Sequence, residues 1–190
     1  MKTFSKEPSE TRSQNICCDL CGTYNEIPLW KDSIISFVRC TECGLVYQNP
    51  QPDSKELLER YDDTYFEYEI QNEESFYRLM DLGLRDVGFY NIEKHFLEQN
   101  SGSASSPAFL DVGCATGRLL AGMRERGWKV QGVEVCEQSA LYGINNHKLE
   151  IHIGTLDTAK FEDSSFDVVH CSHLIEHLTE PRKFVTDVYR

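Results

Sequence analysis

The sequence predicts an α/β protein in which a parallel sheet follows a small cysteine-rich unit and a helical segment. Three observations indicate this fold class. Strand-like and helix-like apolar patterns alternate from residue 107 onward. Two Cys-x-x-Cys-Gly motifs lie within residues 17–50. Apolar side chains recur at helical spacing within residues 51–106.

The N-terminal residues 1–16 are polar and show no apolar periodicity, which predicts a disordered tail. Over the whole chain of 190 residues, 31 acidic side chains outnumber 19 basic ones. This acidic balance disfavours nucleic acids and anionic membranes as partners. The chain lacks a signal-peptide pattern and an apolar run near the roughly 20 residues that cross a bilayer. We therefore expect a cytoplasmic protein with reduced thiols.

Residues 17–50 contain the motifs CDLCG and CTECG, which predict a zinc ribbon. The predicted metal ligands are Cys18, Cys21, Cys40 and Cys43. Four thiolates close the tetrahedral coordination of Zn²⁺, so the ion would be structural rather than catalytic. The glycine after each pair permits a turn that directs backbone amides at the sulfurs. Cys17 is less suitable because its spacing to Cys21 is longer, and four reduced core cysteines are the alternative.

Residues 51–106 predict a helical linker or lid. Asp53 and Glu56 form a plausible N-terminal cap for a first helix. Gly83 and Gly88 weaken a second, longer helix, which the loop at residues 100–107 ends. The apolar residues expected on one face of this second helix are Phe76, Leu79, Met80, Val87, Tyr90 and Leu97.

From residue 107 the pattern changes to alternating strands and helices. The expected strands are residues 108–112, 129–135, 149–153 and 166–171. Helices are expected between the first three of these strands, at residues 116–126 and 136–146. Strands that alternate with helices in this way are typical of a parallel, doubly wound sheet.

The stretch DVGCATG, residues 111–117, joins the first expected strand to a helix. Such a turn offers free backbone amides and a partial positive charge to a phosphate or a carboxylate. A dinucleotide-binding turn would follow the pattern G-x-G-x-x-G. Here Gly113, Ala115 and Gly117 are followed by Arg118 where the last glycine is needed. The spacing therefore disfavours a nicotinamide-dependent dehydrogenase.

The pattern D-x-G-x-A-x-G after a strand resembles motif I of the class I S-adenosylmethionine-dependent methyltransferases. The resemblance continues with Glu134 after the second strand, Gly154 and Thr155 after the third, and residues 161–181. It implies a Rossmann-like methyltransferase sheet, of which residues 107–190 supply the first four of seven strands. We therefore expect a fragment or a natural truncation, whose exposed fourth strand a partner chain or a second copy would cover.

The resemblance also implies a site for S-adenosyl-L-methionine. The implied cofactor-binding residues are Asp111, Gly113, Cys114, Ala115, Gly117, Glu134, Thr155 and Leu156. The two glycines would let the backbone approach the methionine part, whose amino group Asp111 would orient. Glu134 would accept both ribose hydroxyls. Thr155 stands where the family usually carries an acid, so Asp157 or a backbone amide near Leu156 would contact the adenine.

The stretch HLIEH, residues 173–177, has two interpretations. It matches the H-x-x-E-H helix of some zinc proteases, which needs a third ligand downstream. It also fits the E-H-x-x-x-P ending of the methyltransferase segment, through Glu176, His177 and Pro181. Ubiquinone-type O-methyltransferases hold a metal there with an earlier acid, whose position His173 takes. His173 and His177 are candidate general bases, and a packing role is the alternative.

Taken together, these features predict an S-adenosylmethionine-dependent methyltransferase with a structural zinc ribbon. The ending of the ribbon, CGLVYQNPQP, and the tyrosine-rich helices after it resemble a bacterial methyltransferase subgroup that acts on small molecules or surface sugars. A small molecule or a sugar is therefore the expected methyl acceptor. The alternative is a non-catalytic zinc-ribbon binding module that retains a vestigial S-adenosylmethionine-binding half.

Overall fold

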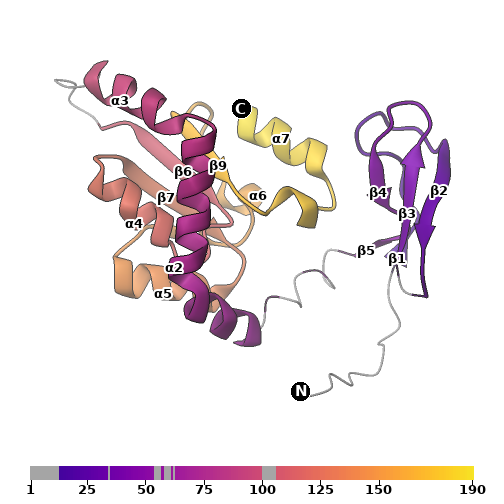
Figure 1. Cartoon of the computed structure of the whole chain (residues 1–190), viewed down its shortest axis with the longest axis horizontal. Helices are drawn as coiled ribbons and strands as arrows, with labels where there is room; N and C mark the ends of the chain where they lie inside the picture. The colour runs from indigo at the N-terminus through magenta and orange to yellow at the C-terminus, as the bar shows by residue number, and fades with distance from the viewer. Residues whose placement is uncertain (1–12, 34, 54–56, 58–60, 62, 100–105) are drawn as a thin grey trace. The chain divides into compact units, whose positions relative to one another are not determined.

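The computed structural model describes residues 13–33, 35–53, 57, 61, 63–99 and 106–190. They form two compact units, which Figure 1 shows as a ribbon. The first, here called the ribbon unit, takes its described residues from 1–60 and 178–183. The second, here called the sheet unit, takes them from 61–177 and 184–190. Within the described residues, no helix has both the length and the apolar character needed to cross a membrane.

The ribbon unit contains two small antiparallel sheets. Strands β2 (Glu26–Lys31), β3 (Ser36–Cys40) and β4 (Val46–Gln48) form one, with β3 in the middle. Strands β1 (Ser13–Gln14) and β5 (Gln51–Pro52) form the other.

Strand β1 lies within the segment that the sequence predicts to be a tail. Ser13 and Gln14 pair with β5, and the Ile16 amide donates to the Asn49 side chain at 3.1 Å. Ser13 and Gln14 are therefore held by strand pairing, and Ile16 by a hydrogen bond from its amide to a side chain. Such bonds need no apolar side chains, so apolar periodicity could not reveal this strand.

The sheet unit is built on a four-stranded parallel sheet, as the sequence predicts. Its strands are β6 (Ala108–Val112), β7 (Lys129–Glu134), β8 (Ile151–Ile153) and β9 (Val168–Cys171). The order across the sheet is β8-β7-β6-β9, so β9 pairs with β6 at one edge. The helices that connect or follow these strands are α4 (Arg118–Glu125), α5 (Glu137–His147), α6 (Leu156–Ala159), the 3-10 helix η1 (Ile175–His177) and α7 (Pro181–Tyr189).

The core lies on both faces of this sheet because successive strand residues point to opposite faces. Phe109 packs on the face that α4 and α5 cover, together with Leu120, Met123 and Trp128. Leu110 and Val112 pack on the other face, with apolar residues from α6 and with Phe184 of α7. A sheet covered on both faces explains why the strands read as continuous apolar runs.

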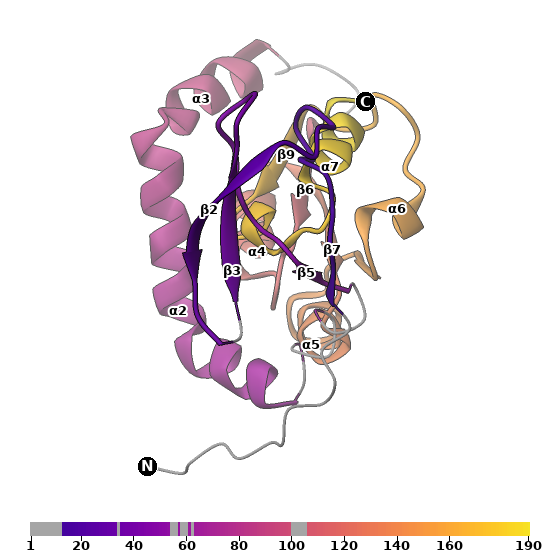
Figure 2. The ribbon, with the colours of Figure 1, turned by 90° about the vertical axis from the view of Figure 1, so that its right-hand side faces the viewer.

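Among the described residues, helices α2 (Asp63–Asp86) and α3 (Phe89–Gln99) precede the sheet, and Figure 2 shows the bend between them. The bend lies at Gly88, whose φ of 73° is in the left-handed region. In α2, Tyr77, Met80 and Leu84 pack towards the core at helical spacing.

The predicted apolar face of the second helix is therefore partly wrong. Phe76, Leu79 and Val87 are exposed. The packed residues of α2 lie one position after the first two, at Tyr77 and Met80, and Val87 lies beyond the end of the helix. The predicted cap at Asp53 and Glu56 cannot be compared, because Glu56 lies outside the described residues.

Candidate cofactor site and metal centre

The turn between β6 and α4 has three residues in the left-handed region. Their φ angles are 75° at Gly113, 50° at Ala115 and 75° at Gly117. Gly117 is the N-cap of α4, so the helix starts at Arg118, two residues later than predicted. A Cβ atom on Gly117 would lie 2.4 Å from the Cδ1 atom of Leu149, whereas one on Gly113 would lie 3.4 Å from the nearest atom of Leu174. The turn thus requires glycine at position 117 for two separate reasons.

Replacing Gly117 by alanine is expected to lower the free energy of unfolding of the sheet unit by roughly 2–4 kcal/mol. The left-handed backbone costs a residue with a Cβ atom about 1–2 kcal/mol, and the clash with Leu149 adds to this. Gly83→Ala is the matched control, because position 83 lies inside α2 and its Cβ atom would meet open space. The control should raise stability by about 0.5–1 kcal/mol. Equal losses in urea denaturation would contradict the requirement at position 117.

Two buried carboxylates lie at the carboxyl ends of neighbouring strands. Asp111 is 2% exposed and Glu134 is 5% exposed. Asp111 and His170 occupy matching positions on β6 and β9, and Asp111 Oδ1 lies 2.7 Å from His170 Nδ1. His170 could not be predicted as a site residue, because nothing in its local pattern distinguishes it from other residues of a strand.

Glu134 connects the turn to the start of α5. Its Oε2 atom accepts the Ala115 amide at 2.8 Å, and its Oε1 atom accepts the Cys136 amide at 2.7 Å. Burial raises the pKa of Glu134, while the backbone amides of Cys136, Ala115 and Val135 oppose this shift. Each carboxylate oxygen can accept more than one hydrogen bond. The donor and acceptor chemistry of Glu134 therefore fits a pair of hydroxyl donors such as those of a ribose.

The remaining predicted cofactor residues have structural roles of their own. The Cys114 side chain is buried in the core, and the Cys114 amide donates to the Val133 carbonyl at 3.1 Å. Thr155 is the N-cap of α6 and forms a capping box with Thr158. Leu156 begins α6, and its side chain packs on the sheet. Leu156 and Cys114 would therefore offer a cofactor backbone atoms rather than functional side chains.

The two candidate bases lie after β9. The η1 helix contains His177 but not His173, whose φ is 52°, so no single helix carries both histidines. The zinc-protease interpretation is therefore wrong. Both side chains are exposed, and the Nδ1 atom of His173 lies 3.6 Å from Oε1 of Glu176. Within the part of the chain that the structure describes, this segment does not gather three possible metal ligands.

Comparison with known proteins agrees with this geometry. A family model described as a methyltransferase domain matches residues 110–190, which include the turn, Glu134 and the segment after β9. The matched residues 110–190 are called the methyltransferase domain below. In this methyltransferase domain the predicted S-adenosylmethionine-binding turn occupies its expected place between the first strand and the first helix of the sheet.

Curated relatives match less than half of this chain. The ubiquinone biosynthesis O-methyltransferase of Idiomarina loihiensis is 38% identical over 99 residues, which are 47% of this chain and 40% of that protein. The protein of the same name from Neisseria meningitidis serogroup C is 38% identical over 84 residues, which are 40% of this chain and 35% of that protein. The chain thus spans less than half the length of these relatives.

Among solved structures, a putative S-adenosyl-L-methionine-dependent methyltransferase from Methanococcus maripaludis shares the fold. The match has a TM-score of 0.52 and 12% sequence identity, and it covers 68% of this chain and 58% of that one. It supports the predicted Rossmann-like arrangement of the methyltransferase domain.

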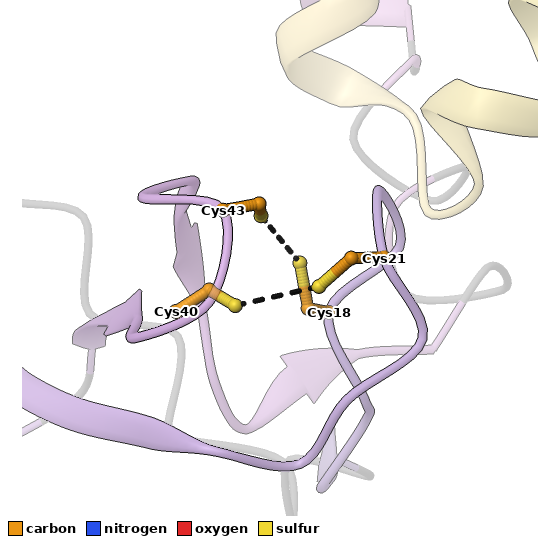
Figure 3. Close-up of side chains that lie close together, drawn as sticks. All are labelled: Cys18, Cys21, Cys40 and Cys43. Carbon is orange, nitrogen blue, oxygen red and sulfur yellow. Dashed lines mark hydrogen bonds between the residues drawn. The ribbon is translucent and has the colours of Figure 1, made fainter.

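Outside the methyltransferase domain, the ribbon unit brings the four predicted ligands together (Figure 3). The sulfur atoms of Cys18, Cys21, Cys40 and Cys43 all lie within 4.8 Å of one another. Two of the pairs, Cys18 with Cys43 and Cys21 with Cys40, are separated by 3.5 Å. Zinc–sulfur bonds of about 2.3 Å in a tetrahedron place the sulfurs about 3.8 Å apart. The donor set and its spacing therefore fit a zinc ion.

The two cysteine motifs have matching turns. Gly22 and Gly44 both have φ near 80°, and their amides donate to the carbonyls of Cys18 and Cys40. Amides of Cys43 and Glu42 act on the Cys40 sulfur and, against burial, lower the pKa of this thiol to about 7. Backbone amides thus favour a thiolate at Cys40, which is the form that binds a metal. Cys17 is not part of the cluster.

Proposed function

We propose that this chain binds S-adenosyl-L-methionine and transfers its methyl group to a small-molecule acceptor. The observation that carries the proposal is the Glu134 carboxylate, which joins the left-handed turn to the start of α5 within the family match. Gly113 is exposed and leaves the backbone of the turn accessible to the methionine part of the cofactor, while Gly117 is buried against Leu149 and fixes the shape of the turn. Asp111, held by His170, would orient the amino group of the cofactor.

When bound, the cofactor supplies an electrophilic methyl group on a positively charged sulfur. The residues of this chain would then bind, orient and move a proton. Methyl transfer depends mainly on holding the acceptor oxygen, the methyl carbon and the sulfur in line. A hydroxyl acceptor also loses its proton to a base, for which we propose His173 or His177. The products are the methyl ether, S-adenosylhomocysteine and the protonated base.

We propose a hydroxyl oxygen as the methyl acceptor atom. The support is the name of the curated relatives, which are O-methyltransferases of ubiquinone biosynthesis. Because this chain spans 40% of the first of them, the acceptor class of the relatives is a starting point for a screen. Phenolic small molecules and sugars are the two classes to compare. The non-catalytic binding module is not favoured, since a methyltransferase family model matches the segment that carries the turn.

For the ribbon unit we propose a structural zinc ion. Its support is the group of four sulfurs within 4.8 Å, which offers a complete tetrahedral donor set. A site of four protein ligands has no open coordination position, so we assign the ion no part in methyl transfer.

Calorimetric titration of the purified chain with S-adenosylhomocysteine tests the proposed function. We expect saturable binding near one site per chain, followed by transfer of labelled methyl groups from S-adenosyl-L-methionine to one of the two acceptor classes. A folded, zinc-loaded chain that binds neither compound would contradict the proposal. Stoichiometric binding without transfer to any acceptor would instead indicate a non-catalytic binding module.

A further inference from the structure

A third buried carboxyl group lies close to the proposed cofactor site. Glu69, in α2, is 5% exposed, as buried as Glu134. Its Oε2 atom accepts a short hydrogen bond from the Ser139 hydroxyl in α5, and the Tyr65 phenol also hydrogen-bonds to Glu69. Neither Glu69 nor its partners belong to the residues that the family resemblance implies. The structure therefore adds an acid, from a different helix, to the surroundings of the turn.

Hydrogen bonds place Glu69 and Glu134 at the same end of α5, because Ser139, the partner of Glu69, lies three residues after Cys136, whose amide donates to Glu134. The charge of Glu134 acts on Glu69 and on Tyr65, and all three carboxyl groups act on the buried Cys114. The titratable groups that face Glu69 are thus Tyr65 from its own helix, Glu134 from β7 and Cys114 from the turn. From α5, the facing group is the neutral Ser139 hydroxyl.

The surroundings of Glu69 make its charge sensitive to pH. Burial is the main reason that its pKa rises to about 7, the charge of Glu134 adds to this rise, and the hydrogen bonds from Ser139 and Tyr65 oppose it. Glu69 is therefore neutral below about pH 7 and negative above it. A negative Glu69 places a further like charge beside Glu134, which a positively charged ligand would stabilise.

We propose that Glu69 is a further specificity-determining residue of the cofactor site, which in its ionised form favours the positively charged cofactor over its neutral product. This inference rests on the proposed function. S-adenosyl-L-methionine carries a sulfonium charge that S-adenosylhomocysteine lacks, and the two differ otherwise only by the transferred methyl group. An ionised carboxylate in a poorly solvated site attracts the sulfonium and leaves the neutral thioether nearly unaffected. Glu69 thus favours replacement of the bound product by fresh cofactor.

The test is the ratio of the dissociation constant of S-adenosylhomocysteine to that of S-adenosyl-L-methionine, measured calorimetrically from pH 6 to pH 8.5. We expect this ratio to rise with pH, with a midpoint near pH 7. The expected rise is about fivefold, the size of one charge acting across the site at an effective dielectric constant of about 20–40. Other titratable groups that change the two dissociation constants by the same factor leave this ratio unchanged.

Two variants assign the effect to Glu69. Glu69→Gln should give a ratio that stays constant across the pH range. Ser139→Ala removes a hydrogen bond that lowers the pKa of Glu69, so it should shift the midpoint to higher pH. Glu73→Gln is the matched control, because Glu73 also links α2 to α5, through His147 at 3.4 Å. This control should keep the rise and the midpoint of the original chain.

The outcomes separate this inference from the proposed function. If the original chain binds both compounds with a ratio that does not change with pH, the inference is overturned and the proposed function stands. A rise that survives in Glu69→Gln has the same meaning. Should Glu69→Gln fail to fold, a midpoint that does not move in Ser139→Ala overturns the inference. If the original chain binds neither compound, the proposed function falls, and the inference falls with it.

Discussion

Replacing Glu134 by alanine should weaken the binding of S-adenosylhomocysteine about 10- to 150-fold. The corresponding loss of about 1.5–3 kcal/mol is typical of hydrogen bonds to a charged group. The substitution removes the proposed acceptor of the ribose hydroxyls, and it also frees the amides of Ala115 and Cys136 that Glu134 holds. Calorimetric titration measures the change directly, and the zinc content of the variant should equal that of the original chain.

Glu137→Ala is the matched control for this experiment. Glu137 lies in the first turn of α5, three residues after Glu134, and its side chain is exposed. The control therefore removes the same charge from the same neighbourhood but removes no contact with the turn. We expect its affinity to change less than twofold. Equal losses in both variants would show that net charge, and not the position of Glu134, decides the affinity.

Replacing Cys40 by serine should remove the metal and the order of the ribbon unit together. Structural zinc sites supply about 10–16 kcal/mol of binding free energy, most of which is folding free energy in a unit as small as this one. The four sulfurs come from two separate turns of the chain. Losing one sulfur therefore leaves the metal site with an incomplete set of ligands. Metal content by mass spectrometry and protease resistance of residues 13–53 measure the two losses.

Cys17→Ser controls for the loss of a thiol in the same stretch of chain. Cys17 lies next to Cys18 but outside the cluster, so this variant should keep its metal and its protease resistance. Cys40→Ser should also keep its affinity for S-adenosylhomocysteine, because the acids and the turn of the proposed site belong to the sheet unit. A variant that loses zinc and cofactor affinity to the same extent would contradict two separate sites.

Much of the fold could be predicted from the sequence where local pattern decides the structure. The strand at residues 108–112 is found with its predicted bounds, because a short apolar run between loop and turn residues has few alternatives. The four cysteines meet as predicted, since each Cys-x-x-Cys-Gly motif brings its own two sulfurs together. Glu134 could be found because its place at a strand end is itself a local feature.

The sequence could not predict features that depend on distant partners. His170 meets Asp111 only through the register of β9 on β6, and Glu69 meets Ser139 across 70 residues. Neither residue has a local pattern that sets it apart. The break between the two helices at Gly88 has a local signal, but this signal is ambiguous. A glycine within a helical apolar pattern weakens the helix without showing whether the helix ends there.

The pairing of Asp111 with His170 has a consequence for the order of folding during synthesis. The two residues are 59 positions apart, and β9 is the last of the four strands to be made. The glycine turn and Glu134 leave the ribosome well before His170 does. Asp111 therefore lacks its hydrogen-bond partner until β9 pairs with the edge of β6. Contacts this distant in sequence form slowly. A nascent chain arrested before residue 168 would therefore present the turn complete in sequence but with its first acid not yet held in place.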